Sequence, residues 1–242
     1  MKKMDEYEIE KTVLCAKDHN GNEGVLEAWR QHPDRFWPLV YVNPTEGAEE
    51  CRRKIERYVD QEGFKGIKMN PLRHAFVADD EMVDPVMEEA EKRGIPVFIH
   101  SGHPPYSLPW SIALLAERFP KVKVVMIHMG HGHGVYIDAA IKMAKRHPNI
   151  YLEMSGMPMG VKIKQAYEEV GADRIMFGTD FPFHHPSVEI QKVLTCGLPE
   201  AAQQAQAEQD AEQAQDAENW EENWQSWQVQ NADAEEDDLL LY

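Results

Sequence analysis

Short apolar runs alternate with longer amphipathic segments along the first 180 residues of the chain. The runs are rich in β-branched residues and are apolar throughout rather than at every second position. This pattern is typical of strands in a parallel sheet that is covered on both faces. The runs end roughly every 24–31 residues, about the length of one strand followed by one helix. The predicted strands are 12–16, 37–42, 66–69, 95–100, 122–128, 149–154 and 174–178.

Three of the segments between these strands have apolar residues at helical spacing. In one of them, Val83, Val86, Met87 and Ala90 share a helix face. Each segment ends before a glycine or a proline, which are common residues after the C-terminus of a helix. The predicted helices are 80–93, 134–147 and 160–170, followed by Gly94, Pro148 and Gly171.

The alternation of strands and helices fits two α/β architectures, an open doubly wound sheet and a (β/α)8 barrel. No glycine-rich phosphate loop follows the first strand, as a dinucleotide-binding sheet would need. The sequence therefore predicts a TIM-barrel-like fold. It predicts only seven of the eight strands, because residues 1–11 are polar, too short for a strand and its crossover helix, and read as the end of a helix. Strands 12–16 and 174–178 would then have unpaired edges, unless a homo-oligomer or the C-terminal tail covers them.

Three of the predicted strands lead into a side chain that can bind a metal ion. His100 and His128 each end a strand, and Asp180 follows a third strand closely. A single histidine at such a position is more often a hydrogen-bonded residue of the core. Three side chains at equivalent positions predict a site at the carboxyl ends of the strands, where barrel enzymes do their chemistry. Imidazoles with one carboxylate suit Zn²⁺ or another divalent first-row ion.

Other polar residues lie at strand ends and in the following loops. Lys68 ends a predicted strand and could bind an anionic substrate from inside the barrel mouth. Alternatively, its stem could cover the rim while its amine reaches water. His131 and His133 lie on a glycine-rich loop, and His184 and His185 form a pair. Histidines in such loops can bind metal ions weakly, but more often they face solvent.

The formal net charge of −17 is concentrated at the C-terminus. Residues 201–242 contain 12 Asp and Glu and no Lys or Arg, so residues 1–200 have a balance of only −5. The sequence has no cluster of Lys and Arg that would indicate a nucleic-acid partner. The three cysteines are few and widely spaced, which argues against a disulfide framework. With no apolar leader and no apolar run of 18 residues, the sequence predicts a cytoplasmic protein without a membrane segment.

The sequence divides into a barrel domain, residues 1–200, and an acidic low-complexity tail, residues 201–242. Residues 201–218 are all Ala, Gln, Glu or Asp, which favour helix but offer little to bury. Three tryptophans then recur at helical spacing. The tail is expected to dock these rings on the barrel or to stay solvated, and a helix that binds a partner protein is the third alternative. The tryptophans are Trp220, Trp224 and Trp227.

These motifs resemble the amidohydrolase-related family, metal-dependent TIM-barrel hydrolases that include the aminocarboxymuconate semialdehyde and resorcylate decarboxylases. The resemblance covers roughly residues 4–200. It implies that His100 and Asp180 are metal ligands, that His128 activates the metal-bound water or polarises the substrate, and that Asp180 takes the proton. The matching segments are 32–36, 63–68, 95–102, 124–132, 149–158 and 172–183.

The chain departs from the family pattern at both ends. The first strand of the family carries a His-x-His pair that supplies two metal ligands, and nothing before Lys11 resembles it. Asp18 and His19 follow the next strand with the wrong spacing. The closing helices of the family should follow Leu198, where this chain turns into its acidic tail. The sequence thus predicts a family core with weakened affinity for its divalent metal.

The predicted function is hydrolysis of a small carbonyl-containing or anionic substrate by water activated on a divalent metal, Zn²⁺ in the first instance. Asp180 would accept the proton of that water, and His128 would stabilise charge on the attacked carbonyl. Lys68 would bind the substrate. The same residues would suit a non-oxidative decarboxylase, in which a proton replaces CO₂. A catalytically impaired, non-enzymatic barrel remnant is the third alternative.

Overall fold

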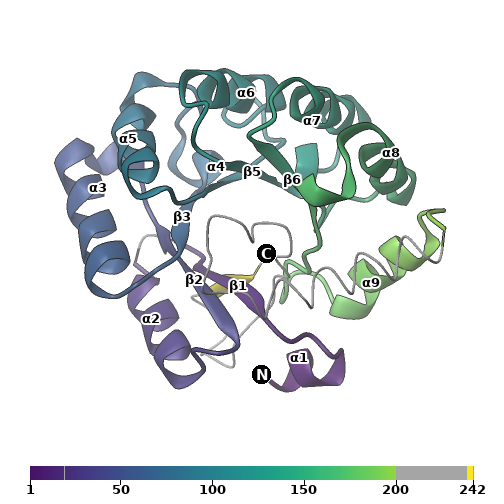
Figure 1. Cartoon of the computed structure of the whole chain (residues 1–242), viewed down its shortest axis with the longest axis horizontal. Helices are drawn as coiled ribbons and strands as arrows, with labels where there is room; N and C mark the ends of the chain where they lie inside the picture. The colour runs from purple at the N-terminus through teal and green to yellow at the C-terminus, as the bar shows by residue number, and fades with distance from the viewer. Residues whose placement is uncertain (19, 200–238, 242) are drawn as a thin grey trace.

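A curled sheet of seven parallel strands forms the centre of the protein, with helices on its outside (Figure 1). The computed structural model describes residues 1–18, 20–199 and 239–241. The sheet is half of a barrel, as predicted for an incomplete TIM barrel. The strands are β1 (Thr12–Ala16), β2 (Phe36–Tyr41), β3 (Gly66–Met69), β4 (Val97–His100), β5 (Val124–Ile127), β6 (Ile150–Glu153) and β7 (Ile175–Met176).

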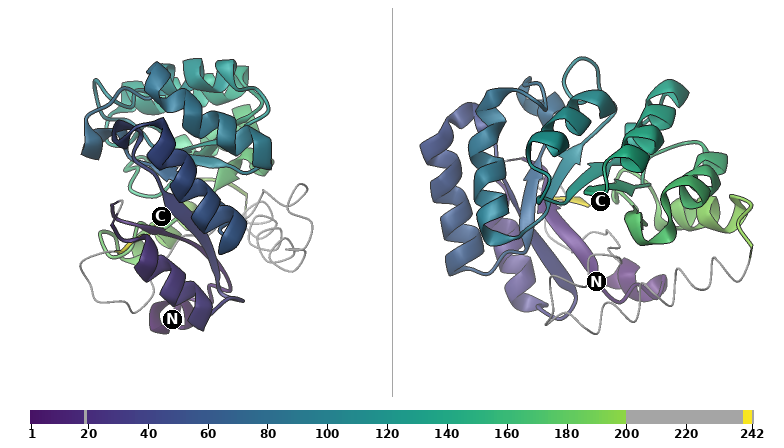
Figure 2. Two further views of the ribbon diagram at one scale, coloured as in Figure 1. Left: turned by 90° about the vertical axis from the view of Figure 1, so that its left-hand side faces the viewer. Right: turned by 45° about the horizontal axis from the view of Figure 1, so that its top comes forward.

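A helix follows almost every strand and packs against the outer face of the sheet, as the turned views also show (Figure 2). The three helices predicted from apolar spacing are confirmed, and the first of them ends at Gly94, which adopts the left-handed conformation that suits this position. The helices are α1 (Lys2–Glu6), α2 (Asn22–Gln31), α3 (Ala48–Ile55, continued by a π-helical turn Glu56–Gln61), α4 (Pro71–His74), α5 (Asp84–Arg93), α6 (Pro109–Arg118), α7 (Gly134–Arg146), α8 (Gly160–Val170) and α9 (Pro186–Thr195).

The seven strands pair in sequence order and all in parallel. Their residues are buried apart from His100 and Tyr151, which are partly exposed. The uniform burial explains the unbroken apolar runs, because one face of each strand packs on the helices and the other points into the curl of the sheet. Parallel pairing also brings all carboxyl ends to one edge, which is where the predicted site residues lie.

The open edge of β1 is covered by the C-terminus. The short strand β8 (Leu239–Leu241) pairs with β1 antiparallel, so that Cys15 lies opposite Leu240. Within the described part of the chain β7 pairs only with β6, and residues 1–11 contain α1 and no strand. The predicted gap in the barrel is therefore confirmed, and of the two predicted covers the tail is the one observed.

The residue that follows α1 and the residue that precedes α9 are also in contact. The rings of Tyr7 and His185 make an edge-to-face contact with 5.6 Å between their centroids. This contact links the start of the chain to the residue that precedes α9. The tryptophans Trp220, Trp224 and Trp227, and the expected helix over 201–218, lie outside the described residues.

The cysteines Cys15, Cys51 and Cys196 are buried, and the structure pairs none of them in a disulfide among the residues it describes. In the same part of the chain, each helix is too short or too polar to pass through a lipid bilayer.

Deleting residues 239–242 should expose the edge of β1 and cause self-association. An unpaired strand edge presents free N–H and C=O groups that pair readily with another chain. Size-exclusion chromatography at increasing protein concentration should show larger species for the deletion variant than for the full chain. Deleting only Tyr242, which follows β8, is the matched control and should change nothing. Equal elution of all three proteins would mean that β8 does not protect β1.

Candidate active site

Lys68, His100, His128 and Asp180 all lie at the carboxyl edge of the sheet. Lys68 is the third residue of β3, His100 ends β4, His128 follows β5 directly, and Asp180 lies in the loop after β7. The rings of His100 and His128 are perpendicular, with 4.8 Å between their centroids. The structure thus brings the sequence-predicted site residues together, while the roles assigned to them stay predictions.

Lys68 is fully buried. Its amine does not reach water at the rim, so that interpretation of its position is wrong. Burial lowers the pKa of Lys68 to about 7, and this shift is opposed by the nearby groups of Cys15, Asp180 and Glu153. The lysine therefore lies among the acidic groups of the site, inside the curl of the sheet.

The two strand-end histidines are neutral at pH 7. Burial lowers the pKa of His100 well below its ordinary value, and the electrostatic influence of the nearby His128 and Lys68 lowers it further. Burial and Lys68 likewise lower the pKa of His128. Neutral imidazoles can each accept one proton or one metal ion through an unprotonated nitrogen.

Asp180 is 8% exposed and adopts a left-handed backbone conformation with φ of +48°. Burial raises the pKa of this carboxyl to about 8, Glu153 raises it further, and Lys68 opposes the shift. Its Oδ1 atom is buried and has no hydrogen-bond partner among the described residues. A buried oxygen of this kind is available to a ligand that enters the site.

Two charged residues of α9, Glu189 and Lys192, stabilise the loop that contains Asp180. Glu189 is 1% exposed, contacts the ammonium of Lys192, and lies 2.9 Å through Oε1 from Nδ1 of His184. The Lys192 ammonium also donates hydrogen bonds to the carbonyl oxygens of Met154 at 3.0 Å and Met157 at 2.8 Å. These bonds tie the segment after Asp180 to the loop after β6, and His184 is engaged in the tie although it was expected to face solvent.

Four histidines form a cluster at the ends of β4 and β5, comprising His100, His103, His128 and His131. The His103 ring stacks on His100 with centroids 4.7 Å apart, and His131 lies 4.6 Å from His103 and 5.4 Å from His128. His131 is therefore half-buried in the cluster, against the expectation that it faces solvent. His133 is exposed and caps α7 by accepting a hydrogen bond from the Val135 amide.

Glycines let the two loops of this cluster approach each other. Gly102 has φ of +86°, and a Cβ atom at this position would lie 2.4 Å from the carbonyl oxygen of Gly130. Gly130 has φ of +95°, and its Cβ would meet the carbonyl oxygen of Tyr136 at the same distance. Only glycine fits such backbone contacts, so these residues allow the close approach of the loops that carry His103 and His131.

Glu153 and Ser155 are site residues that the sequence interpretation missed. Both are fully buried at the end of β6 and contact His128. Burial raises the pKa of Glu153 to about 7, opposed by hydrogen bonds from His128 and Ser155. A signal was present, because Glu153 is the next-to-last residue of the predicted strand 149–154 and ends β6 in the structure.

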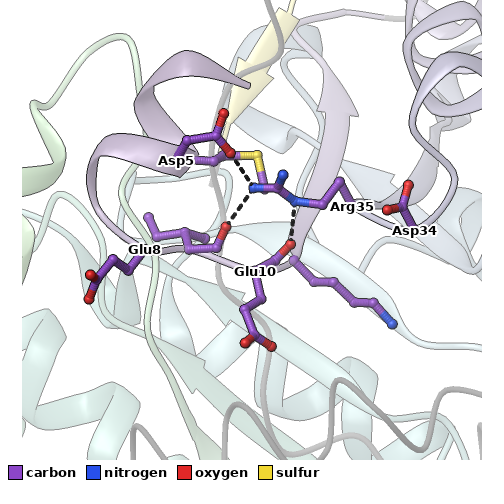
Figure 3. Close-up of a pocket in the computed structure, with 8 residues that line it drawn as sticks. Asp5, Glu8, Glu10, Asp34 and Arg35 are labelled. Carbon is purple, nitrogen blue, oxygen red and sulfur yellow. Dashed lines mark hydrogen bonds and ion pairs between the residues drawn. The ribbon is translucent and has the colours of Figure 1, made fainter.

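A cavity of about 650 Å³ lies at the other end of the strands. Its lining includes Asp5, Glu8, Asp34 and Arg35 (Figure 3). The Arg35 guanidinium bonds to the Asp5 carboxylate at 2.8 Å and to the backbone carbonyls of Ile9 and Glu10. These segments precede β1 and β2, at the amino end of the strands, whereas barrel active sites lie at the carboxyl end. The cavity is therefore separate from the candidate site.

The donor set at the site is incomplete for a catalytic metal. A catalytic divalent ion normally has three protein ligands. Within the described residues no three His, Cys, Asp or Glu side chains are arranged to hold a metal ion. His100 and Asp180 occupy the positions that the family resemblance assigns to metal ligands, and the residues present do not supply the rest.

A comparison with known protein families gives a match over most of the chain. The sequence profile of the family described as amidohydrolase matches residues 9–216, most of the chain. The chain belongs to this family. The expected resemblance is confirmed, although the strand with the His-x-His pair is not found in residues 1–18.

Related proteins share the fold and about a quarter of the residues. The γ-resorcylate decarboxylase of Rhizobium radiobacter is 24% identical over 213 residues, which are 68% of this chain and 65% of that protein. The chain thus spans slightly less than two thirds of the length of this relative.

Solved structures show the same fold. An uncharacterised TIM-barrel protein from Bordetella bronchiseptica has a TM-score of 0.74 at 23% identity, covering 88% of this chain and 82% of that one. A dihydroxybenzoic acid decarboxylase from Polaromonas, solved with manganese and 2-nitroresorcinol, has a TM-score of 0.62 at 21% identity, covering 83% and 80%.

The substitution Gly102→Ala should destabilise the protein by about 3 kcal/mol, from a strained positive φ and a backbone clash. Gly132→Ala in the neighbouring loop is the matched control, because no atom lies within 4 Å of its Cβ position. Its cost should stay below about 1 kcal/mol. Urea denaturation measures both values, and equal stability of the two variants would contradict the close loop approach.

Titration with Mn²⁺ or Zn²⁺ should give no stoichiometric binding at micromolar affinity, because the described residues do not supply a complete ligand set. Calorimetry on the apo protein measures this directly. Tight binding of one ion that His100→Ala and Asp180→Ala both abolish would show that the site is complete.

Proposed function

We propose that this chain carries a carboxy-lyase site that removes CO₂ from a small aromatic carboxylate without oxidation. The observation that carries the proposal is the convergence of Lys68, His100, His128 and Asp180 at the carboxyl edge of one parallel sheet. Support comes from the relatives, since decarboxylases recur among the proteins of similar sequence and fold. The substrates named for those proteins are hydroxylated benzoates.

Three of these residues have a part in this reaction. The Lys68 ammonium would pair with the substrate carboxylate inside the curl of the sheet. The bond from the ring carbon to the carboxylate breaks, and its electron pair stays on the ring carbon. The Asp180 carboxyl oxygen then gives a proton to that carbon, and neutral CO₂ leaves. His128 would accept a hydrogen bond or proton from a ring hydroxyl through its unprotonated nitrogen.

A divalent ion and a second reaction also bear on this site. The Polaromonas structure contains manganese. A divalent ion, where bound, would supply Lewis-acid polarisation of a substrate oxygen. The described residues do not complete a site for such an ion, so no step of the reaction above is derived through it. Hydrolysis of a small carbonyl compound, the reaction first expected from the sequence, is the second candidate, and the decarboxylase relatives favour it less.

The test is CO₂ release from γ-resorcylate and 5-carboxyvanillate by the purified chain, with chelator and with added Mn²⁺. Both His128→Ala and Asp180→Asn should lower kcat at least 100-fold, the size of a lost acid–base group (about 10²–10⁴). Lys68→Met should raise KM. Lys65→Met is the matched control, because Lys65 is exposed and lies at the amino end of β3. Absence of CO₂ release under both conditions would contradict the proposal and favour the non-enzymatic remnant.

A further inference from the structure

Glu153 forms three hydrogen bonds behind His128. Its Oε2 accepts from the backbone N–H of His128 at 3.1 Å and from the Ser155 hydroxyl at 2.8 Å. Its Oε1 accepts from the backbone N–H of Ser155 at 2.6 Å. The Glu153 carboxylate is the acceptor in all three bonds, and the side chain is fully buried. An ionised carboxylate matches this donor set, whereas an amide would turn an N–H group toward one of the donors.

The same two residues fix the imidazole of His128. Its Nδ1 lies 2.8 Å from the carbonyl oxygen of Ser155 and 3.1 Å from the Ser155 hydroxyl oxygen. A carbonyl oxygen can only accept, so Nδ1 carries the hydrogen. The Ser155 hydroxyl donates its hydrogen to Glu153. The lone pairs of the hydroxyl oxygen are therefore free to accept from Nδ1–H of His128. The neutral ring therefore carries its lone pair on Nε2.

The backbone of His128 needs this support. His128 has φ of +65° and Met129 has φ of +35°, in the left-handed region that side chains with a Cβ rarely adopt. The bond from the His128 N–H to Glu153 is made in that conformation. A Cβ atom at Gly156 would lie 3.2 Å from Nδ1 of His128, so the loop after β6 passes close against the imidazole.

We infer that Glu153 is a positioning residue which, through Ser155 and the His128 amide, holds His128 in a single tautomer with its lone pair on Nε2. The inference deepens the proposed function, in which His128 Nε2 accepts a hydrogen bond or proton from the substrate. Glu153 does not touch the substrate. It acts by fixing which nitrogen of His128 is the acceptor and where the ring lies.

The test is long-range ¹H–¹⁵N correlation NMR of protein labelled at histidine, at pH 8. The full chain should show His128 as one neutral tautomer with the proton on Nδ1. Glu153→Gln should give averaged nitrogen shifts of two tautomers. The matched control is Ser101→Ala, which removes a buried hydroxyl bonded to Ile127 and Gly130 beside the same loop but not to the imidazole. It should keep the single tautomer, and a single Nδ1–H tautomer in folded Glu153→Gln would overturn the inference.

A second variant keeps the test valid if Glu153→Gln does not fold. Ser155→Ala retains the backbone carbonyl but loses the hydroxyl that links Glu153 to the ring. The Nδ1–H proton of His128 should then exchange with water at least 10-fold faster than in the full chain. An unchanged exchange rate would overturn the link through Ser155.

An activity measurement separates this inference from the proposed function. If the chain releases CO₂, Glu153→Gln should lower kcat at least 10-fold and leave KM within about 2-fold, since the substrate contacts are intact. A rise in KM alone would contradict a positioning role. If the chain releases no CO₂, the proposed function fails, and the tautomer spectra still decide the role of Glu153.

Discussion

Parallel pairing of successive strands is the constraint on which the site depends. Each strand hydrogen-bonds to the next one along the chain, so every carboxyl end comes to the same edge of the sheet. Side chains about thirty residues apart in sequence therefore meet in space. The curl of the sheet turns them toward one another. The residues gathered in this way are Lys68, His100, His128, Glu153 and Asp180.

Much of this arrangement could be predicted because buried parallel strands leave a strong sequence signal. The apolar runs located all seven strands to within about three residues at each end, and His100, His128 and Asp180 were found from their positions at strand ends. The features that were missed depend on tertiary contacts. The burial of His131 follows from the close approach of Gly102 and Gly130, which no local pattern reveals.

Two other features, β8 and the role of Glu153, were not predicted from the sequence for different physical reasons. β8 is three residues long and pairs antiparallel with β1 across more than 200 residues of sequence, so local periodicity does not identify it. Glu153 resembles an ordinary polar residue at the end of a strand. Its importance appears only when the loop after β6 folds back on His128, so that three donors converge on one carboxylate.

The charges buried at the site support the proposed loss of CO₂ over hydrolysis. The carboxyl groups of Glu153, Asp180 and Glu189 are buried near the two amines of Lys68 and Lys192, so acidic groups outnumber basic ones in this region. Burial raises the pKa of Glu153 and Asp180, and the neighbouring carboxylates raise both pKa values further. A substrate carboxylate would add one more negative charge to this region. Its departure as neutral CO₂, with a proton delivered to the ring carbon, removes that charge. Hydrolysis of an ester or amide would instead create a new carboxylate there, which the same excess of negative charge disfavours.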